Sequence, residues 1–221
     1  MAADPPLLLV AMKDEAQAFS SCQRDAGRDF LRVGGVRHEL LISGPGAGSV
    51  IEALAGRSPS AILQVGFAGA LRPDFAPGEL YRVVSVRRGP EVIPVEPAPI
   101  HAALPDLPAA RLVTAPAPLG AADKAVMRGH DAGDLVDMES AQVLDHCRLN
   151  GIPWTGIRVV SDALADEIPA CVQEAFDGRR FRLAPILRAF ITSGRSRRDL
   201  LALRRRARLC SQRLASCLFD S

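Results

Sequence analysis

The 221-residue chain is poor in aromatic residues and cysteines, and it lacks long apolar runs. It has one Trp and one Tyr, so we expect a core of Leu, Val, Ile and Ala. Its five cysteines are widely spaced and form no CxxC pair, which favours free thiols in a reducing compartment over a disulfide framework. No segment approaches the roughly 18 apolar residues of a membrane-spanning helix, and the apolar run at residues 7–12 has no basic flank of a signal peptide. We therefore expect a cytoplasmic protein.

Several common catalytic and cofactor motifs are missing as well. The four histidines have no ligand spacing with one another or with the cysteines, so we expect no metal site. No GxSxG serine motif is present. Residues 44–48 (Gly-Pro-Gly-Ala-Gly) lack the GxGxxG spacing, and their proline removes a backbone donor, which argues against a nicotinamide site. We expect no cofactor of any kind.

Apolar runs that alternate with helical patterns predict an α/β fold with a largely parallel or mixed sheet. The length favours one domain over residues 1–221. Residues 89–120 are rich in Pro and predict a loop region over the site, with room for a short strand at 112–114. The sequence predicts strands at 7–11, 39–43, 61–65, 80–86, 135–138 and 155–160, and helices at 14–22, 49–55, 121–127 and 140–150.

Three carboxylates follow predicted strands. Glu139 comes after the strand at 135–138, Asp162 after the strand at 155–160, and Glu15 after the first strand. Each alone fits a structural role, because acidic residues stabilise helix N-termini. Charged side chains at buried strand ends are, however, rare unless they are paired or used, and sites in α/β proteins form at the carboxyl ends of strands. We therefore predict one site containing all three, with Glu139 and Asp162 on neighbouring parallel strands.

A run of small residues follows the third predicted strand, where residues 66–70 read Gly-Phe-Ala-Gly-Ala. Small residues at this place have two interpretations. They allow the backbone to approach a ligand closely, or they allow a helix to pack closely on the strand. The sequence favours neither interpretation over the other.

Four segments, in this order, resemble motifs of the superfamily of purine nucleoside phosphorylases and methylthioadenosine/S-adenosylhomocysteine nucleosidases. They are residues 11–15 (Ala-Met-Lys-Asp-Glu), 66–71 (Gly-Phe-Ala-Gly-Ala-Leu), 136–140 (Val-Asp-Met-Glu-Ser) and 158–162 (Arg-Val-Val-Ser-Asp). The resemblance covers residues 7 to about 166 and implies a three-layer fold with a central mixed sheet flanked by helices. Within the superfamily, the Met-Glu-Ser variant and the Arg-rich tail make the chain most similar to the hopanoid-associated nucleosidases, which are proposed to remove adenine from adenosylhopane.

The resemblance implies a role for each matching residue. Glu15 would orient the attacking water with help from Arg158, Glu139 would bind the ribose hydroxyls, and Asp162 would protonate the leaving purine. The residues implied to contact the substrate are Met12, Gly66, Phe67, Ala68, Asp137, Met138 and Ser161.

Two positions depart from the superfamily pattern. Phe67 stands where better-known members carry Ser, and Gln64 stands where the hexameric phosphorylases carry an Arg for phosphate. Phosphate recognition favours charge-assisted donors, and near the glycine run only Arg158 could supply one. We therefore expect a nucleosidase that hydrolyses a purine (adenine) nucleoside modified at the 5′ position. The alternatives are a phosphate-dependent purine nucleoside phosphorylase and a catalytically silent nucleoside-binding protein with a membrane- or partner-binding tail.

The C-terminal section is strongly basic. Residues 179–221 contain 12 Arg and two Asp (net +10), whereas the first 178 residues contain 15 Lys+Arg and 23 Asp+Glu (net −8). The pattern predicts an amphipathic helix at 196–219 within an Arg-rich helical extension at 178–221. This helix fits an outer layer packed on the domain, or peripheral contact with the anionic inner face of a membrane. No aromatics interleave the arginines, so we expect no nucleic-acid partner. The resemblance implies a small-molecule nucleoside substrate and a homo-oligomer.

Overall fold

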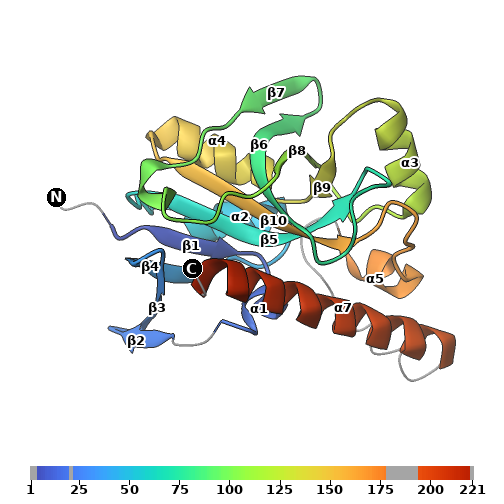
Figure 1. Cartoon of the computed structure of the whole chain (residues 1–221), viewed down its shortest axis with the longest axis horizontal. Helices are drawn as coiled ribbons and strands as arrows, with labels where there is room; N and C mark the ends of the chain where they lie inside the picture. Colours follow the sequence, from blue (N-terminus) through green and yellow to red (C-terminus); the bar gives the residue numbers. More distant parts are fainter. Residues whose placement is uncertain (1–3, 20–21, 178–193, 220–221) are drawn as a thin grey trace.

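The computed structural model describes residues 4–19, 22–177 and 194–219. It contains a ten-stranded mixed sheet flanked by helices, which confirms the predicted α/β architecture (Figure 1). The strands are β1 (Leu7–Val10), β2 (Gln23–Asp25), β3 (Arg28–Val33), β4 (Val36–Ile42), β5 (Ile62–Ala70), β6 (Leu80–Arg88), β7 (Glu91–Pro94), β8 (Ala109–Thr114), β9 (Leu135–Asp137) and β10 (Trp154–Asp162). The helices are α1 (Lys13–Ala16), α2 (Ala47–Leu54), the 3-10 helix η1 (Pro99–His101), α3 (Ala121–Gly129), α4 (Ser140–Asn150), α5 (Ala170–Ala175) and α7 (Gly194–Phe219).

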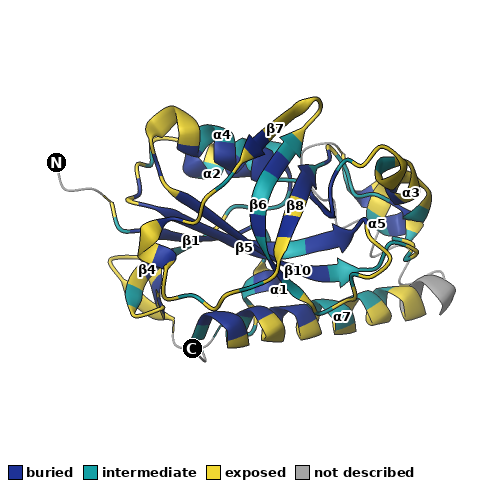
Figure 2. Ribbon diagram, turned by 45° about the horizontal axis from the view of Figure 1, so that its top comes forward, coloured by how far each residue is buried: buried dark blue, intermediate teal, exposed yellow. Residues whose placement is uncertain are grey.

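The central strands are mostly apolar because helices cover both faces of the sheet. In β1, Leu7 and Leu9 belong to a core that includes side chains of α2 and α4. Leu8 and Val10 belong to a second core that includes side chains of α7. Buried residues accordingly run along the central strands and the inner side of α7 (Figure 2). Burial on both faces explains why the sequence shows continuous apolar runs rather than a polar–apolar alternation.

The sheet has the strand order β10-β6-β8-β9-β5-β1-β4-β3-β2, with β7 paired to β6. Strand β10 also pairs with β5, so β5, β10, β6, β8 and β9 form a closed ring. Strand β1 pairs in parallel with β4 and with β5, and β5 also pairs in parallel with β10. The carboxyl ends of β1, β5 and β10 therefore lie at one edge.

The prediction that Glu139 and Asp162 follow neighbouring parallel strands is wrong. Strand β5 lies between β9 and β10, and β9 runs antiparallel to β5. Val136 is opposite Gly69, so the chain after β9 runs back toward the level of Gly66. Strand β9 therefore reaches the site from the opposite direction. No local pattern in its three residues encodes that choice of partner.

The irregular region at 89–120 is not a single loop over the site. It contains β7, η1 and β8. Its middle packs at the amino end of β10, where Thr155 Oγ1 accepts a 2.8 Å hydrogen bond from the backbone N–H of Ala98. Asp162 lies at the other end of that strand. Since this part of the region is bound far from the predicted site, the expected cover over the substrate is wrong for residues 98–101.

The N-terminal part differs from the prediction in two places. The helix expected at 14–22 ends at Ala16, and a hairpin of β2 and β3 follows it. Its turn residues Ala26 and Gly27 have φ values of 47° and 81°, as type I′ hairpin turns require. The hairpin is hard to recognise in the sequence because all three residues of β2 are exposed and polar.

The C-terminal helix is present. Helix α7 spans Gly194–Phe219, which confirms the helix expected at 196–219. Its inner side packs against α1, β3, β5 and β10 and carries the buried residues Cys210, Leu214 and Cys217. Residues 178–193 of the expected extension lie outside the described residues. No described helix is long and apolar enough to cross a membrane.

Candidate active site

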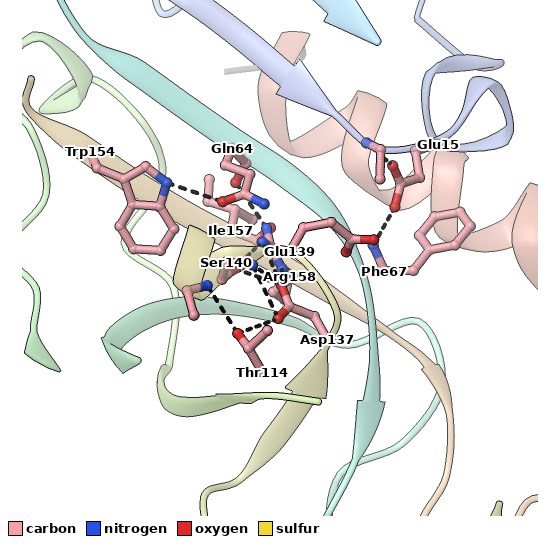
Figure 3. A network of polar contacts seen from close by, with 12 residues as sticks. Glu15, Gln64, Phe67, Thr114, Asp137, Glu139, Ser140, Trp154, Ile157 and Arg158 are labelled. Atoms are coloured by element: carbon pink, nitrogen blue, oxygen red, sulfur yellow. Dashed lines mark hydrogen bonds and ion pairs between the residues drawn. The ribbon is translucent and has the colours of Figure 1, made fainter. Parts of the chain in front are cut away.

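Glu15 is held in one position by backbone donors. It lies in α1, directly after β1, and is 3% exposed. One carboxylate oxygen accepts hydrogen bonds from the N–H groups of Ala11 (2.7 Å) and Met12 (2.8 Å), and the other accepts one from Phe67 (3.0 Å; Figure 3). Burial raises the pKa of Glu15, although these hydrogen bonds and the charge of Arg158 act in the opposite direction. A carboxylate fixed in this way is suited to orient a small polar molecule.

The small residues of β5 make room for two carboxylates. A Cβ atom at Gly66 would lie 2.7 Å from Glu15 Oε1, and one at Gly69 would lie 2.9 Å from Asp162 Oδ2. The run is part of β5 rather than a turn after a strand. In the structure its glycines accommodate acidic side chains, which neither sequence interpretation foresaw. Glu15 and Asp162 therefore lie along the same four residues of β5.

Glu139 extends toward Glu15 instead of capping its own helix (Figure 3). It precedes α4, but its Oε1 accepts a 2.5 Å hydrogen bond from the backbone N–H of Gly46. Burial raises the pKa of Glu139 to about 8, and the negative charges of Asp137 and Glu15 add to this shift. The structural role considered for Glu139, a carboxylate stabilising the helix N-terminus, falls instead to Asp137, which accepts from the N–H of Ser140.

Asp137 and Arg158 form a buried ion pair, and the side chain of each is 2% exposed. Arg158 donates to Asp137 (3.0 Å), to the hydroxyl of Ser140 (2.5 Å) and to two backbone carbonyls. Asp137 also accepts from Ser140 Oγ (2.6 Å) and Thr114 Oγ1 (3.0 Å). The predicted substrate contact of Asp137 does not fit this burial. Both side chains act on Glu139 through their charges, Asp137 raising its pKa and Arg158 lowering it.

Asp162 contacts a cation rather than the other two carboxylates. The ammonium group of Lys124 pairs with its Oδ2 and donates to the carbonyl of Ala163 (2.8 Å). Ser161 Oγ donates to Asp162 Oδ1 at 2.5 Å. Lys124 comes from α3 and is 1% exposed. Sequence reasoning did not assign Lys124 a role, because a lysine among the charged residues of a helix gives no signal of burial.

The remaining predicted residues fall into two groups. Met12, Phe67, Met138 and Ser161 are partly exposed and therefore accessible to a small molecule. Ala68 is buried in β5. Gln64, which replaces the arginine of the hexameric phosphorylases, is buried and accepts a hydrogen bond from the indole N–H of Trp154 (3.1 Å). Among the described residues, no three His, Cys, Asp or Glu side chains are grouped so as to hold a metal ion.

Comparison with known proteins supports the superfamily resemblance. A family model described as the Phosphorylase superfamily matches residues 111–192. No curated protein matches the chain by sequence. A variant of MTAN from Chlamydia trachomatis bound to MTA is 22% identical, with a TM-score of 0.63 over 98% of this chain and 96% of that one.

Two further solved structures have the same fold. The 5′-methylthioadenosine/S-adenosylhomocysteine nucleosidase from Helicobacter pylori is 16% identical, with a TM-score of 0.60 over 98% of both chains. The nucleosidase of the same name from Campylobacter jejuni is 15% identical, with a TM-score of 0.61 over 97% of this chain and 98% of that one. The chain therefore has the fold of the nucleoside phosphorylases and nucleosidases.

Proposed function

We propose that the protein is a single-domain N-glycosidase that hydrolyses a purine nucleoside and releases adenine. One observation carries this proposal: Glu15 and Asp162 occupy the space that side chains at Gly66 and Gly69 would fill. Glu139 extends toward the first of these carboxylates (Figure 3). A fold without a reaction to perform has no need for such a set of acidic groups beside one strand, because burying them costs free energy.

Each carboxylate has a task in cleavage of an N-glycosidic bond. The reaction passes through an oxocarbenium-like sugar, and the leaving base must accept a proton. Asp162, oriented by Ser161, supplies that proton to the purine from its protonated form, and the ammonium group of Lys124 stabilises the carboxylate that is left. Glu139 binds the ribose hydroxyls and, once ionised, favours the positive charge that develops on the sugar. Glu15 orients the attacking water, and Arg158 acts on both glutamates through its charge.

The polar contacts at β5 and β10 favour water over phosphate as the attacking group. The side chain of Gln64 is buried and bound to Trp154, so it offers phosphate no charge. The guanidinium of Arg158 already donates to Asp137, Ser140 and two carbonyl groups. Phosphate binding would require free charge-assisted donors. A phosphate-dependent phosphorylase is therefore the second candidate.

The substrate class follows from the resemblance and the similar folds. Both support an adenine nucleoside with a modified 5′ group, such as methylthioadenosine or S-adenosylhomocysteine, and the sequence resemblance alone adds an adenosylhopane-like lipid. The partly exposed Met12, Phe67 and Met138 offer apolar surface to such a nucleoside. A homo-oligomer stays an expectation from the resemblance, and light scattering of the purified protein tests it.

The experiment measures the products of the full-length protein with each of these nucleosides, with and without phosphate. Hydrolysis gives adenine and a free sugar at the same rate in both conditions, and Asp162→Asn lowers that rate by about 10²–10⁴-fold. A sugar 1-phosphate formed only with phosphate would make the protein a phosphorylase. If no nucleoside yields adenine but one binds, the protein is a catalytically silent binder.

We also propose that the outer face of α7 contacts an anionic membrane surface from the cytoplasmic side. The outer side of this helix is exposed (Figure 2) and includes two partly exposed leucines, Leu201 (45%) and Leu209 (43%). A basic residue near an anionic membrane contributes about 1 kcal/mol of attraction. Among the side chains of α7 whose exposure the structure describes, the exposed arginines are Arg198, Arg204, Arg205, Arg208 and Arg213.

Flotation with vesicles tests this contact. We expect the protein to float with phosphatidylglycerol vesicles but not with phosphatidylcholine vesicles, and to be released by high salt. Replacing Arg204, Arg205 and Arg208 by Gln should abolish flotation. Arg206 is left unchanged because it pairs with Asp166. Equal flotation with both lipids, or by the triple variant, would contradict the proposal.

A further inference from the structure

Helix α1, which carries Glu15, is too short to be stable by itself. It has four residues, and an isolated helix of one turn does not form in water because nucleation is unfavourable. The three hydrogen bonds of the Glu15 carboxylate nevertheless require this turn in a defined place. Something outside α1 must therefore hold it, and the packing of α1 against α7 identifies that element.

Ser211 of α7 completes the backbone hydrogen bonding at the end of α1. Its hydroxyl donates to the backbone carbonyl of Glu15 at 3.0 Å and accepts from the N–H of Ala18 at 3.0 Å. The helix ends at Ala16, so these two groups are not satisfied by a further turn of helix. Ser211 is 0% exposed. A further contact joins the segment after α1 to α7, since the rings of Phe19 and Phe219 pack edge to face with 5.4 Å between their centroids.

The same side of α7 also reaches the segment of Asp162. Cys210 Sγ donates to the carbonyl of Val160 at 3.3 Å, two residues before Asp162. Arg206 pairs with Asp166 at 2.5 Å. Asp166 in turn accepts from the N–H of Ala163, the residue after Asp162, at 2.9 Å. Helix α7 therefore contacts the chain on both sides of Asp162, the proposed acid. It also contacts the backbone of Glu15, the residue proposed to orient water.

We propose that Ser211 and Arg206 are positioning residues, through which α7 holds the segments of Glu15 and Asp162 in the geometry that catalysis needs. Neither side chain touches the substrate. The inference deepens the proposed function and rests on it. It also assigns the C-terminal helix a role in the reaction that is separate from its basic outer face.

The first experiment compares Ser211→Ala with Ser216→Ala, an exposed serine on the same helix. A displacement of about 1 Å in a catalytic group can cost up to about 10²-fold in rate, so loss of one tether should lower kcat by about 10-fold and leave KM within about twofold. Ser216→Ala should match the wild type. Ser211→Thr, which restores the hydroxyl, should recover most of kcat. If Ser211→Ala does not fold, Ser211→Cys, which keeps the volume with a weaker donor, should give an intermediate kcat.

A second pair of variants tests the Asp162 side. Arg206→Gln should lower kcat by about 3-fold, because the ion pair with Asp166 is partly exposed and therefore weaker. Arg88→Gln is the matched control, since it breaks a partly exposed ion pair with Asp145 away from the site. Equal kcat in the two variants would overturn the role of Arg206.

Two further measurements separate positioning from stability and from the proposed function. Leu214→Ala removes a buried side chain of α7 and should lower thermal stability at least as much as Ser211→Ala, with kcat unchanged. An equal loss of kcat in Leu214→Ala would overturn the proposal. Amide hydrogen exchange of residues 11–19 should increase selectively in Ser211→Ala. If the wild type releases no adenine, the proposed function fails, and unchanged exchange would independently overturn the role of Ser211.

Discussion

Two buried polar clusters lie in opposite parts of the central strands, and they are built differently. Near the amino end of β10, His38, His101 and Thr155 form one chain of hydrogen bonds. Because the carbonyl of Val36 accepts from His38 Nδ1, His38 Nε2 must accept from His101 Nε2 (3.1 Å), and His101 Nδ1 accepts from Thr155 Oγ1 (2.9 Å). Burial lowers the pKa of His101 to about 4, so the cluster is neutral.

The second cluster contains more acidic groups than basic ones, and burial raises the pKa of two of them. It contains the carboxylates of Glu15, Asp137 and Glu139 but one guanidinium, that of Arg158. A fully satisfied neutral network stabilises a fold, whereas unbalanced buried charge destabilises it. We infer from this difference that the histidine cluster stabilises the fold and that the acidic cluster serves a reaction. Substitutions in the two clusters should therefore affect different measurements.

The largest expected effect is a loss of turnover in Glu15→Gln. The amide cannot orient or deprotonate water as a carboxylate does, so adenine release should fall by about 10³-fold. Thermal stability should change less than turnover, because removal of a buried acidic group offsets the loss of the backbone hydrogen bonds that the amide nitrogen cannot accept. Rate and melting temperature are measured on the same preparation. Wild-type turnover in this variant would remove Glu15 from the mechanism.

The next largest effect should come from adding a single methyl group at Gly66. In Gly66→Ala the new Cβ would lie 2.7 Å from Glu15 Oε1, so the carboxylate must move and turnover should fall by about 10²-fold. Gly129→Ala is the control, since Gly129 lies in α3 and no atom lies within 4 Å of its Cβ position. A comparable loss in both variants would mean that the effect is not specific to the carboxylate.

Glu139→Gln should change how stability depends on pH. The pKa of Glu139 is about 8 in the folded protein, above the usual 4.5, so the folded state binds more protons between these values and loses stability as pH rises through 8. At pH 8.5 the variant should gain about 2 kcal/mol, or roughly 6 °C in melting temperature. At pH 4 the two proteins should melt alike. If the melting temperatures of the two proteins change with pH in the same way, the raised pKa of Glu139 is contradicted.

The smallest expected effect is in the histidine cluster. Thr155→Val removes the hydroxyl that binds the N–H of Ala98 and the Nδ1 of His101. The free energy of unfolding should fall by about 1.5 kcal/mol, and the melting temperature by roughly 4 °C. Thr155→Ser keeps the hydroxyl and should lose less. Turnover at a temperature where all variants are folded should equal that of the wild type. If Thr155→Val releases adenine more slowly than the wild type at that temperature, the histidine cluster also affects the reaction, and the distinction between the two clusters is wrong.

Much of the fold could be predicted from local patterns. The first strand, the helix at 140–150 and the C-terminal helix follow from apolar runs and helical periodicity. Glu15 and Glu139 could be identified as site candidates because each is a charge beside a buried strand. The hairpin of β2 and β3 was missed, since β2 is polar and exposed and carries no apolar signal.

By itself, the sequence determined most of the elements, the acidic candidates and the basic C-terminal section, because these depend on residues close to one another in the chain. Only the tertiary structure decided which strands are neighbours, since strand pairing joins distant segments by backbone hydrogen bonds that any residue can make. The same holds for the partners of the acidic groups. Lys124 pairs with Asp162 across 38 positions, and Ser211 reaches the backbone of Glu15 across 196. Contacts between residues so far apart in the chain form when the core packs, so no local sequence pattern predicts them.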